Sequence, residues 1–209
     1  DQNWNKVTAN AKIQLTTTDP YAPVLNPQTL VSGTTVFPMI FAKANPAPSG
    51  WTITASTTSD SVASLLSNTS ALVPVSAGPA ARLQFLLPGE TPDPGHIAGG
   101  LKGKTGTPLS PQVGTPYSAV VRLTDAYYNV QTNAVMPSVQ VQTTDPNDNE
   151  VGFLGGNPQS LDPETASATI GVNPVTVGTW TYTVTDPGVT AYQADSSTGI
   201  YVRAGPPVK

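Results

Sequence analysis

The chain has 209 residues, of which only 11% are charged, and its formal net charge is −4. This acidic balance, with no basic stripe, argues against binding to nucleic acid or to anionic membranes, because their phosphates would meet no cationic surface. The sequence has no cysteine, which excludes disulfides and thiolate metal sites, and no run approaches the roughly 18 apolar residues needed to span a bilayer.

The spacing of 22 Pro and 18 Gly predicts many short strands separated by tight turns. In the first part of the chain, residues 1–76, Ile13 and Leu15 alternate with polar residues and predict a strand over 11–15. Residues 36–44 form a more continuous apolar run, which is typical of a strand buried on both faces. Further strands are expected over 51–55 and 71–75. Because the first residue is Asp1 rather than Met, we expect the chain to be processed or excised from a longer polypeptide.

The second part, residues 77–209, predicts a complete β-sandwich. Residues 88–116 are rich in Pro, Gly, Thr and Lys without apolar periodicity, so we expect a long, extended, partly polyproline-like loop there. About seven short strands in roughly 130 residues, with turn signals between them, indicate a sandwich. Six of them are expected over 82–87, 118–123, 138–142, 166–170, 180–184 and 199–202.

An internal repeat relates the two parts of the chain. Five short motifs recur in order, with an offset that drifts only from 124 to 131 residues, as small loop insertions would produce. Residues 80–124 have no counterpart in the first part. The sequence therefore predicts an all-β protein of tandem modules, with module 1–76 truncated and lacking its opening strands. The matched motifs are 1–5 with 125–129, 17–20 with 143–146, 26–30 with 157–161, 51–54 with 180–183, and 77–79 with 204–206.

A strand followed by Asp-x-x-x-Asn and a second strand stands at residues 121–130, with Asp125 and Asn129 bracketing the turn. Asx side chains close such turns by bonding nearby backbone amides. The pattern resembles the bacterial immunoglobulin-like repeats of invasin- and intimin-type surface proteins, although aromatic residues stand at 127 and 128 where those repeats usually have Gly. The resemblance implies tandem immunoglobulin-like β-sandwiches in an extracellular or cell-surface stalk, adhesin or filament, and it brings no catalytic residues with it.

Two sets of residues are candidate sites. Asp145, Asn147, Asn149 and Glu150 place oxygen ligands at the spacing of a calcium loop, whereas the matching stretch of the first module lacks them, and a plain polar turn is the alternative. Trp4, Tyr127 and Tyr128 lie in the Asp-to-Asn turns, where we expect exposed aromatic rings to contact a neighbouring module or a ligand. Trp51 and Trp180 alternate with apolar residues and are expected in the cores.

Enzymatic activity is not expected. Residues 98–105 fall one glycine short of a phosphate-binding loop, and Pro108 and Pro111 prevent the helix that such a loop requires. His96 is the only histidine and lies in the Pro/Gly-rich segment, so neither a transition-metal site nor a catalytic triad is indicated.

The repeat and the truncation together predict a structural protein. We expect its partners to be copies of itself or neighbouring modules, without cofactors other than calcium at 145–150. An incomplete module would expose an unpaired sheet edge that recruits a strand from another chain; otherwise the chain is a slice of a longer array. The alternatives are an adhesin or glycan-binding module that uses the aromatics at 4, 127 and 128, and an accessory domain of a secreted enzyme.

Overall fold

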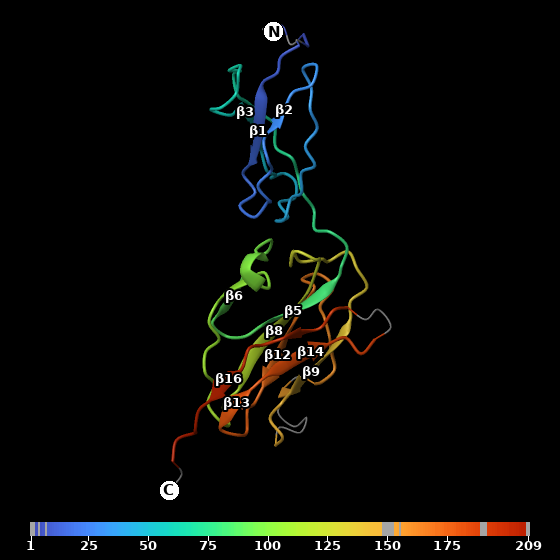
Figure 1. The fold of residues 1–209 in the computed structure, drawn as a ribbon. Helices are drawn as coiled ribbons and strands as arrows, with labels where there is room; N and C mark the ends of the chain where they lie inside the picture. The colour runs from blue at the N-terminus through green and yellow to red at the C-terminus, as the bar shows by residue number, and fades with distance from the viewer. Residues whose placement is uncertain are drawn as a thin grey trace. The chain divides into compact units, whose positions relative to one another are not determined.

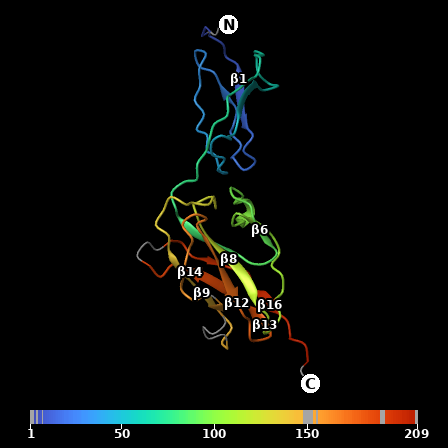
Figure 2. The ribbon, with the colours of Figure 1, turned by 180° about the vertical axis from the view of Figure 1, so that it is seen from behind.

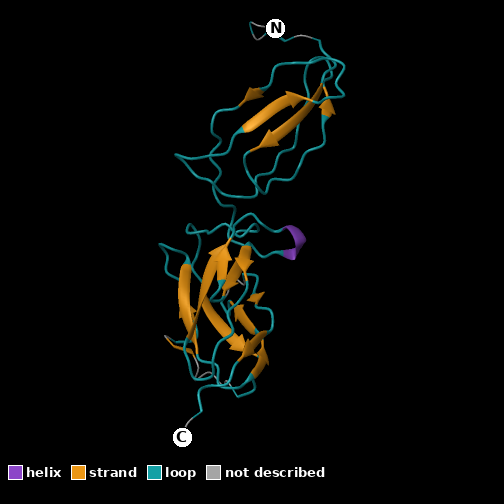
Figure 3. Ribbon diagram, turned by 90° about the vertical axis from the view of Figure 1, so that its left-hand side faces the viewer, coloured by secondary structure: helices purple, strands orange, loops and turns teal. Residues whose placement is uncertain are grey.

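The computed structural model describes residues 3, 5–6, 8–147, 153–154, 156–188 and 192–207. The chain divides into two compact units, residues 1–76 (unit 1) and residues 77–209 (unit 2) (Figure 1). The regular elements of the described residues are strands, apart from one three-residue 3-10 turn, η1 (Ala98–Gly100) (Figure 3). The predicted all-β class is confirmed.

Unit 1 contains a four-stranded antiparallel sheet in the order β2-β1-β3-β4. Its central strands carry the alternation that the sequence predicts, with Leu15 directly opposite Ala55. The predicted strand over 71–75 forms two isolated bridges, Val73 with Trp51 and Val75 with Asn45. The strands are β1 (Lys12–Thr17), β2 (Gln28–Thr29), β3 (Ile53–Thr57) and β4 (Asn68–Thr69).

Unit 2 contains two four-stranded antiparallel sheets. The first has the order β10-β12-β8-β5 and the second has the order β11-β9-β14-β15. In Figures 1 and 2, β8 and β12 lie side by side, as their six-residue ladder requires. A short ladder between β13 (Gly178–Trp180) and β16 (Ile200–Val202) continues the pairing of β14 with β15. The sheet strands are β5 (Arg82–Leu86), β8 (Tyr117–Thr124), β9 (Ser138–Thr143), β10 (Phe153–Leu154), β11 (Gln159–Ser160), β12 (Ser167–Val172), β14 (Tyr182–Thr185) and β15 (Asp195–Ser196).

The strand order of unit 2 is that of an immunoglobulin-like sandwich. In chain order, β5, β8, β10 and β12 share one sheet, whereas β9, β14 and β15 share the other. This is the division of first, second, fourth and fifth strands from third, sixth and seventh strands that defines the immunoglobulin arrangement. β11 adds a further edge strand beside β9.

The core of unit 2 lies between its two sheets. β8 supplies Ala119, Val121 and Leu123, and β9 and β14 supply Val139, Val141, Tyr182 and Val184 from the opposite layer. All seven are at most 1% exposed. The period-2 alternation of these strands therefore places one face of each in a closed apolar layer.

Residues 88–116 are more regular than the extended loop that the sequence predicts. They contain a hairpin of β6 (Glu90–Pro92) and β7 (Lys104–Gly106). The Lys104 ammonium joins its two strands by donating to the Glu90 carboxylate at 2.9 Å. Further along, Gln112 forms a parallel bridge with Arg203. The hairpin leaves no apolar period in the sequence, because backbone bonds and polar side-chain contacts such as the Lys104–Glu90 ion pair hold it together.

Candidate functional site

The sheet of unit 1 matches the second sheet of unit 2 strand for strand. β1 and β3 pair so that Thr17 opposes Ile53 and Leu15 opposes Ala55. The repeat-matched positions in β9 and β14 pair in the same way, Thr143 with Tyr182 and Val141 with Val184. The outer pair agrees as well, because Ala55 opposes Asn68 as Val184 opposes Asp195. Ile13, Leu15 and Ala55 therefore correspond to the core residues Val139, Val141 and Val184.

The same buried carboxylate follows β1 in unit 1 and β9 in unit 2. Asp19 is 4% exposed and Asp145 is 3% exposed. Asp19 Oδ2 accepts the backbone N–H of Ala42 at 2.7 Å, and Asp145 Oδ2 accepts that of Thr176 at 3.1 Å. In both units this carboxylate holds the turn after the strand against a distant segment of the same unit.

The two matched tryptophans mark the same segment. Trp51 Nε1 donates to the Lys43 carbonyl at 2.7 Å, and Trp180 Nε1 donates to the Thr176 carbonyl at 2.9 Å. Lys43 thus corresponds to Thr176. Both tryptophans are half-buried, so the expectation that they lie in the cores is corrected: each indole N–H is bonded to the backbone of another segment.

Residues 35–41 of unit 1 correspond to residues 168–174 of unit 2, which include most of strand β12. Thr34 closes the preceding turn by a bridge to Val31, as Ser167 does with Asp162. The offset there is 133 residues, the same as between Lys43 and Thr176, so Phe37 matches Ile170. Exposure alternates along 35–41, with Phe37 half-buried and Val36 82% exposed.

The two units differ in whether strands cover the apolar face of the matched sheet. In unit 2, β12 pairs with β8 and β8 pairs with β5, and Val139, Val141 and Val184 are 0%, 1% and 0% exposed. In unit 1, residues 35–41 belong to none of the described ladders. The sequence predicts a strand buried on both faces at 36–44, and that expectation is wrong because no strand corresponding to β8 lies beside it within the described part of unit 1.

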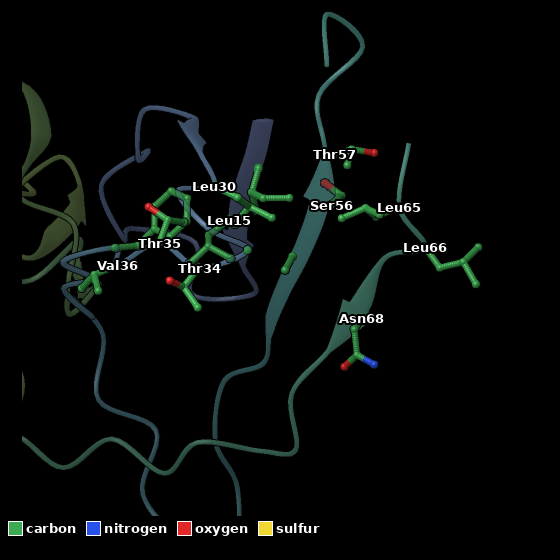
Figure 4. Close-up of a pocket in the computed structure, with 14 residues that line it drawn as sticks. Leu15, Leu30, Thr34, Thr35, Val36, Ser56, Thr57, Leu65, Leu66 and Asn68 are labelled. Carbon is green, nitrogen blue, oxygen red and sulfur yellow. The ribbon is translucent and has the colours of Figure 1, made fainter. Parts of the chain in front are cut away.

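The result is an open apolar groove of about 670 Å3 over the sheet of unit 1. Its floor consists of Ile13, Leu15 and Ala55. Figure 4 shows Thr34, Thr35 and Val36 on one side and Leu65, Leu66 and Asn68 on the other. Leu66 is 99% exposed. Among the described residues of unit 1, only Ala11, Asp19 and Ala42 are buried, so no large apolar side chain there is sealed from water.

The calcium loop expected at 145–150 is described only in part. Asn149 and Glu150 lie outside the described residues. Asp145 Oδ1 accepts the backbone N–H of Asn147 at 3.0 Å, which is the geometry of an Asx turn. Both carboxylate oxygens of Asp145 therefore accept hydrogen bonds from backbone N–H groups. A calcium role for these residues stays a prediction.

The aromatic residues expected to make contacts, Trp4, Tyr127 and Tyr128, differ in their burial where the structure describes them. Trp4 lies outside the described residues, and Tyr127 is half-buried. Tyr128 is 7% exposed; its ring lies 4.9 Å from the Arg82 guanidinium carbon, and its hydroxyl accepts a bond from Arg82 at 3.2 Å. The exposure expected for Tyr128 is thus corrected, because the turn folds its ring against unit 2 itself.

Sequence reasoning missed the role of the Asp-to-Asn turn in unit 2. Asp125 is 3% exposed and accepts the N–H of Gly78 at 2.8 Å, while Gln131 donates to the Gly78 carbonyl at 2.6 Å. The Asp125 carboxylate also accepts the N–H of Tyr127 at 2.8 Å. The turn therefore clamps the backbone at the start of unit 2. The recurrence of Ala-Gly-Pro at 77–79 and 204–206 is the sequence signal that marks this segment.

Groups able to perform acid–base or metal chemistry are scarce. Across the described ranges, no three His, Cys, Asp or Glu side chains gather closely enough to hold a metal ion. The two lysines of the 98–105 segment are engaged: Lys102 donates to Asp195 at 2.5 Å, and Lys104 pairs with Glu90. His96 Nδ1 lies 2.8 Å from Asp93 Oδ2. No described helix is long and apolar enough to cross a membrane.

Comparison with known proteins gives remote structural likenesses only. No family model matches the chain, and no curated protein matches it. A solved structure described as the D0-D1 domain of intimin is similar over 95% of this chain and 84% of its own, with 14% sequence identity and a TM-score of 0.36. At that TM-score and identity, the likeness assigns neither a family nor a function to the chain.

Proposed function

We propose that this chain is part of an extracellular structural repeat protein, a cell-surface stalk or filament, in which unit 1 is completed by strands from a neighbouring subunit. The observation that carries the proposal is the contrast between two matching sheets. The sheet in unit 2 is covered by β5, β8, β10 and β12, and the sheet in unit 1 has an open apolar face.

The energetics of unit 1 support an added layer. Ordering a residue costs about 1–2 kcal/mol of backbone entropy, and small domains offset that cost mainly by burying apolar side chains. Ile13, Leu15 and Phe37 are only half-buried. Covering each of them would contribute up to about 1.5–3 kcal/mol, so the free energy of unit 1 favours a partner that closes the groove.

The backbone of unit 1 supports strands as the form of that partner. Residues 35–41 are extended and alternate in exposure, yet they belong to no described ladder. An extended segment with free edge groups is a template for strand addition. The partners of this chain are then copies of itself or neighbouring modules.

The resemblance of the Asp125-to-Asn129 turn to surface-protein repeats supports an extracellular location. The adhesin alternative depends on exposed aromatics. Tyr128 is buried within unit 2, which leaves the half-buried Tyr127 as the described residue of that set with exposed surface. The accessory-domain alternative predicts a catalytic domain elsewhere in the parent gene.

Electron microscopy of the native assembly, combined with light scattering of the purified chain, tests the proposal. We expect modules joined in rows, and particles that grow with concentration. Leu15→Asp, in the groove floor, should prevent growth, whereas Val62→Asp, at a side chain that is 87% exposed, should leave it unchanged. Single particles in the native material, with the same mass at all concentrations, would contradict the proposal.

A further inference from the structure

We infer that the open groove of unit 1 binds two strands of another polypeptide chain, one pairing antiparallel with residues 35–41 and the other lying along residues 66–68. The inference rests on the proposed function and adds the register and side-chain chemistry of the donated strands. It follows from what covers the matching face in unit 2.

The first strand takes the place of β8. In unit 2, Ile170 opposes Ala119 and Ala168 opposes Val121. Phe37 and Thr35 stand at the positions of Ile170 and Ala168. The donated strand therefore has a small residue opposite Phe37, where the large ring fills the space, and a branched apolar residue opposite Thr35.

The second strand takes the place of β5. In unit 2, the N–H of Leu83 donates to the Gln193 carbonyl at 2.9 Å, and that of Phe85 donates to Asp195 Oδ2 at 2.9 Å. The Arg82–Gln193 bridge is parallel. Asn68 stands at the position of Asp195, so Leu66 stands at that of Gln193. The Leu66 carbonyl and the Asn68 side-chain oxygen are thus placed to accept N–H groups of a parallel strand.

The groove selects its occupant by apolar alternation. No charged residue lines it, so ion pairs contribute nothing to recognition. A shift of one residue would turn every apolar side chain of a strand away from the floor. The fitting partner is a strand pair with apolar residues at every second position, as in β5 and β8.

Hydrogen exchange tests the first strand with the full chain as it exists. The probe is a peptide with the sequence of residues 116–125, which contains β8. We expect it to slow exchange of the amides in 35–41 and to leave those of β9 and β14 unchanged. A control peptide with Asn in place of Val121 and Leu123 should have no effect. Unchanged exchange in 35–41, or equal protection by both peptides, would overturn the inference.

Binding of the labelled peptide, followed by fluorescence anisotropy, adds matched variants. Phe37→Asn, in the groove wall, should weaken binding at least tenfold. Ile40→Asn changes a side chain of the same segment that is 52% exposed and outside the groove lining, and should leave binding unchanged. Equal binding by both variants would overturn the inference.

The two tests fail separately. If the peptide protects 35–41 but the native material consists of single particles, the groove binds a strand and the proposed assembly is contradicted. If the microscope shows rows of modules but the peptide does not protect the amides of 35–41, the proposed assembly is supported and the inferred strand register is overturned.

Discussion

Truncating matched residues in the two sheets should destabilise the two units to different extents. Val141 and Leu15 occupy the same place, in β9 and in β1, but Val141 is 1% exposed and Leu15 is half-buried on the floor of an open groove. Val141→Ala and Leu15→Ala therefore test whether the floor of unit 1 is covered.

The magnitudes follow from the groups removed. Val141→Ala deletes two buried carbons, worth about 0.8 kcal/mol each, and leaves a cavity between packed sheets, so we expect a loss of about 2–3 kcal/mol in the stability of unit 2. Leu15→Ala deletes three carbons that are already partly hydrated. It opens no closed cavity, and we expect a loss of about 1 kcal/mol in unit 1.

Hydrogen exchange during urea titration measures the two losses separately, because amides of β1 and β9 report on different units. Adding a strand donor should raise the cost of Leu15→Ala toward that of Val141→Ala. If Leu15→Ala costs 2–3 kcal/mol in the free chain, the floor of unit 1 is already buried and the reasoning is refuted.

Three further predictions concern single positions. Asp125→Ala should lower the stability of unit 2 by about 1–3 kcal/mol, measured by urea unfolding, because the Gly78 N–H loses its acceptor; a change below about 0.5 kcal/mol would contradict the clamp. Gly103→Ala should cost about 2 kcal/mol or more, because Gly103 has φ +59° and a Cβ there would lie 2.2 Å from the Tyr128 Cβ; an unchanged thermal midpoint would show that the loop yields. Burial, with lesser contributions from Glu90 and Tyr182, raises the pKa of Tyr117 above its ordinary value of 10.0. Its stabilising effect is therefore complete below pH 10 and is lost as pH rises, so the stability advantage of wild type over Tyr117→Phe should shrink above pH 10 in urea titrations. A constant difference would contradict the shift.

Local signals in the sequence predicted much of the sheet structure. Alternation at Ile13 and Leu15 identified β1, and the repeated Thr-Thr-Asp-Pro matched the end of β1 with the end of β9. These features depend on neighbours two residues apart or on Asx turns, so a single strand and its turn contain the necessary information.

Features that depend on distant partners could not be predicted in the same way. The apolar run at 36–44 is typical of a strand buried on both faces, but residues 35–41 belong to none of the described ladders of unit 1. The sequence pattern predicts that Tyr128 is an exposed turn residue. In the structure its side chain packs closely against Gly103, and the Arg82 guanidinium lies over its ring. The hairpin of β6 and β7 likewise depends on backbone pairing between strands that residues 93–103 separate, and neither strand has an apolar alternation that would reveal it.

An experimental structure of the chain in its assembled form, at a resolution that separates strands, tests the central claim most directly. The account predicts a strand beside residues 35–41, contributed by another chain, with apolar side chains over Leu15 and Ala55. Residues 1–76 closing into a sandwich by themselves, or a groove left bare in the assembly, would contradict it.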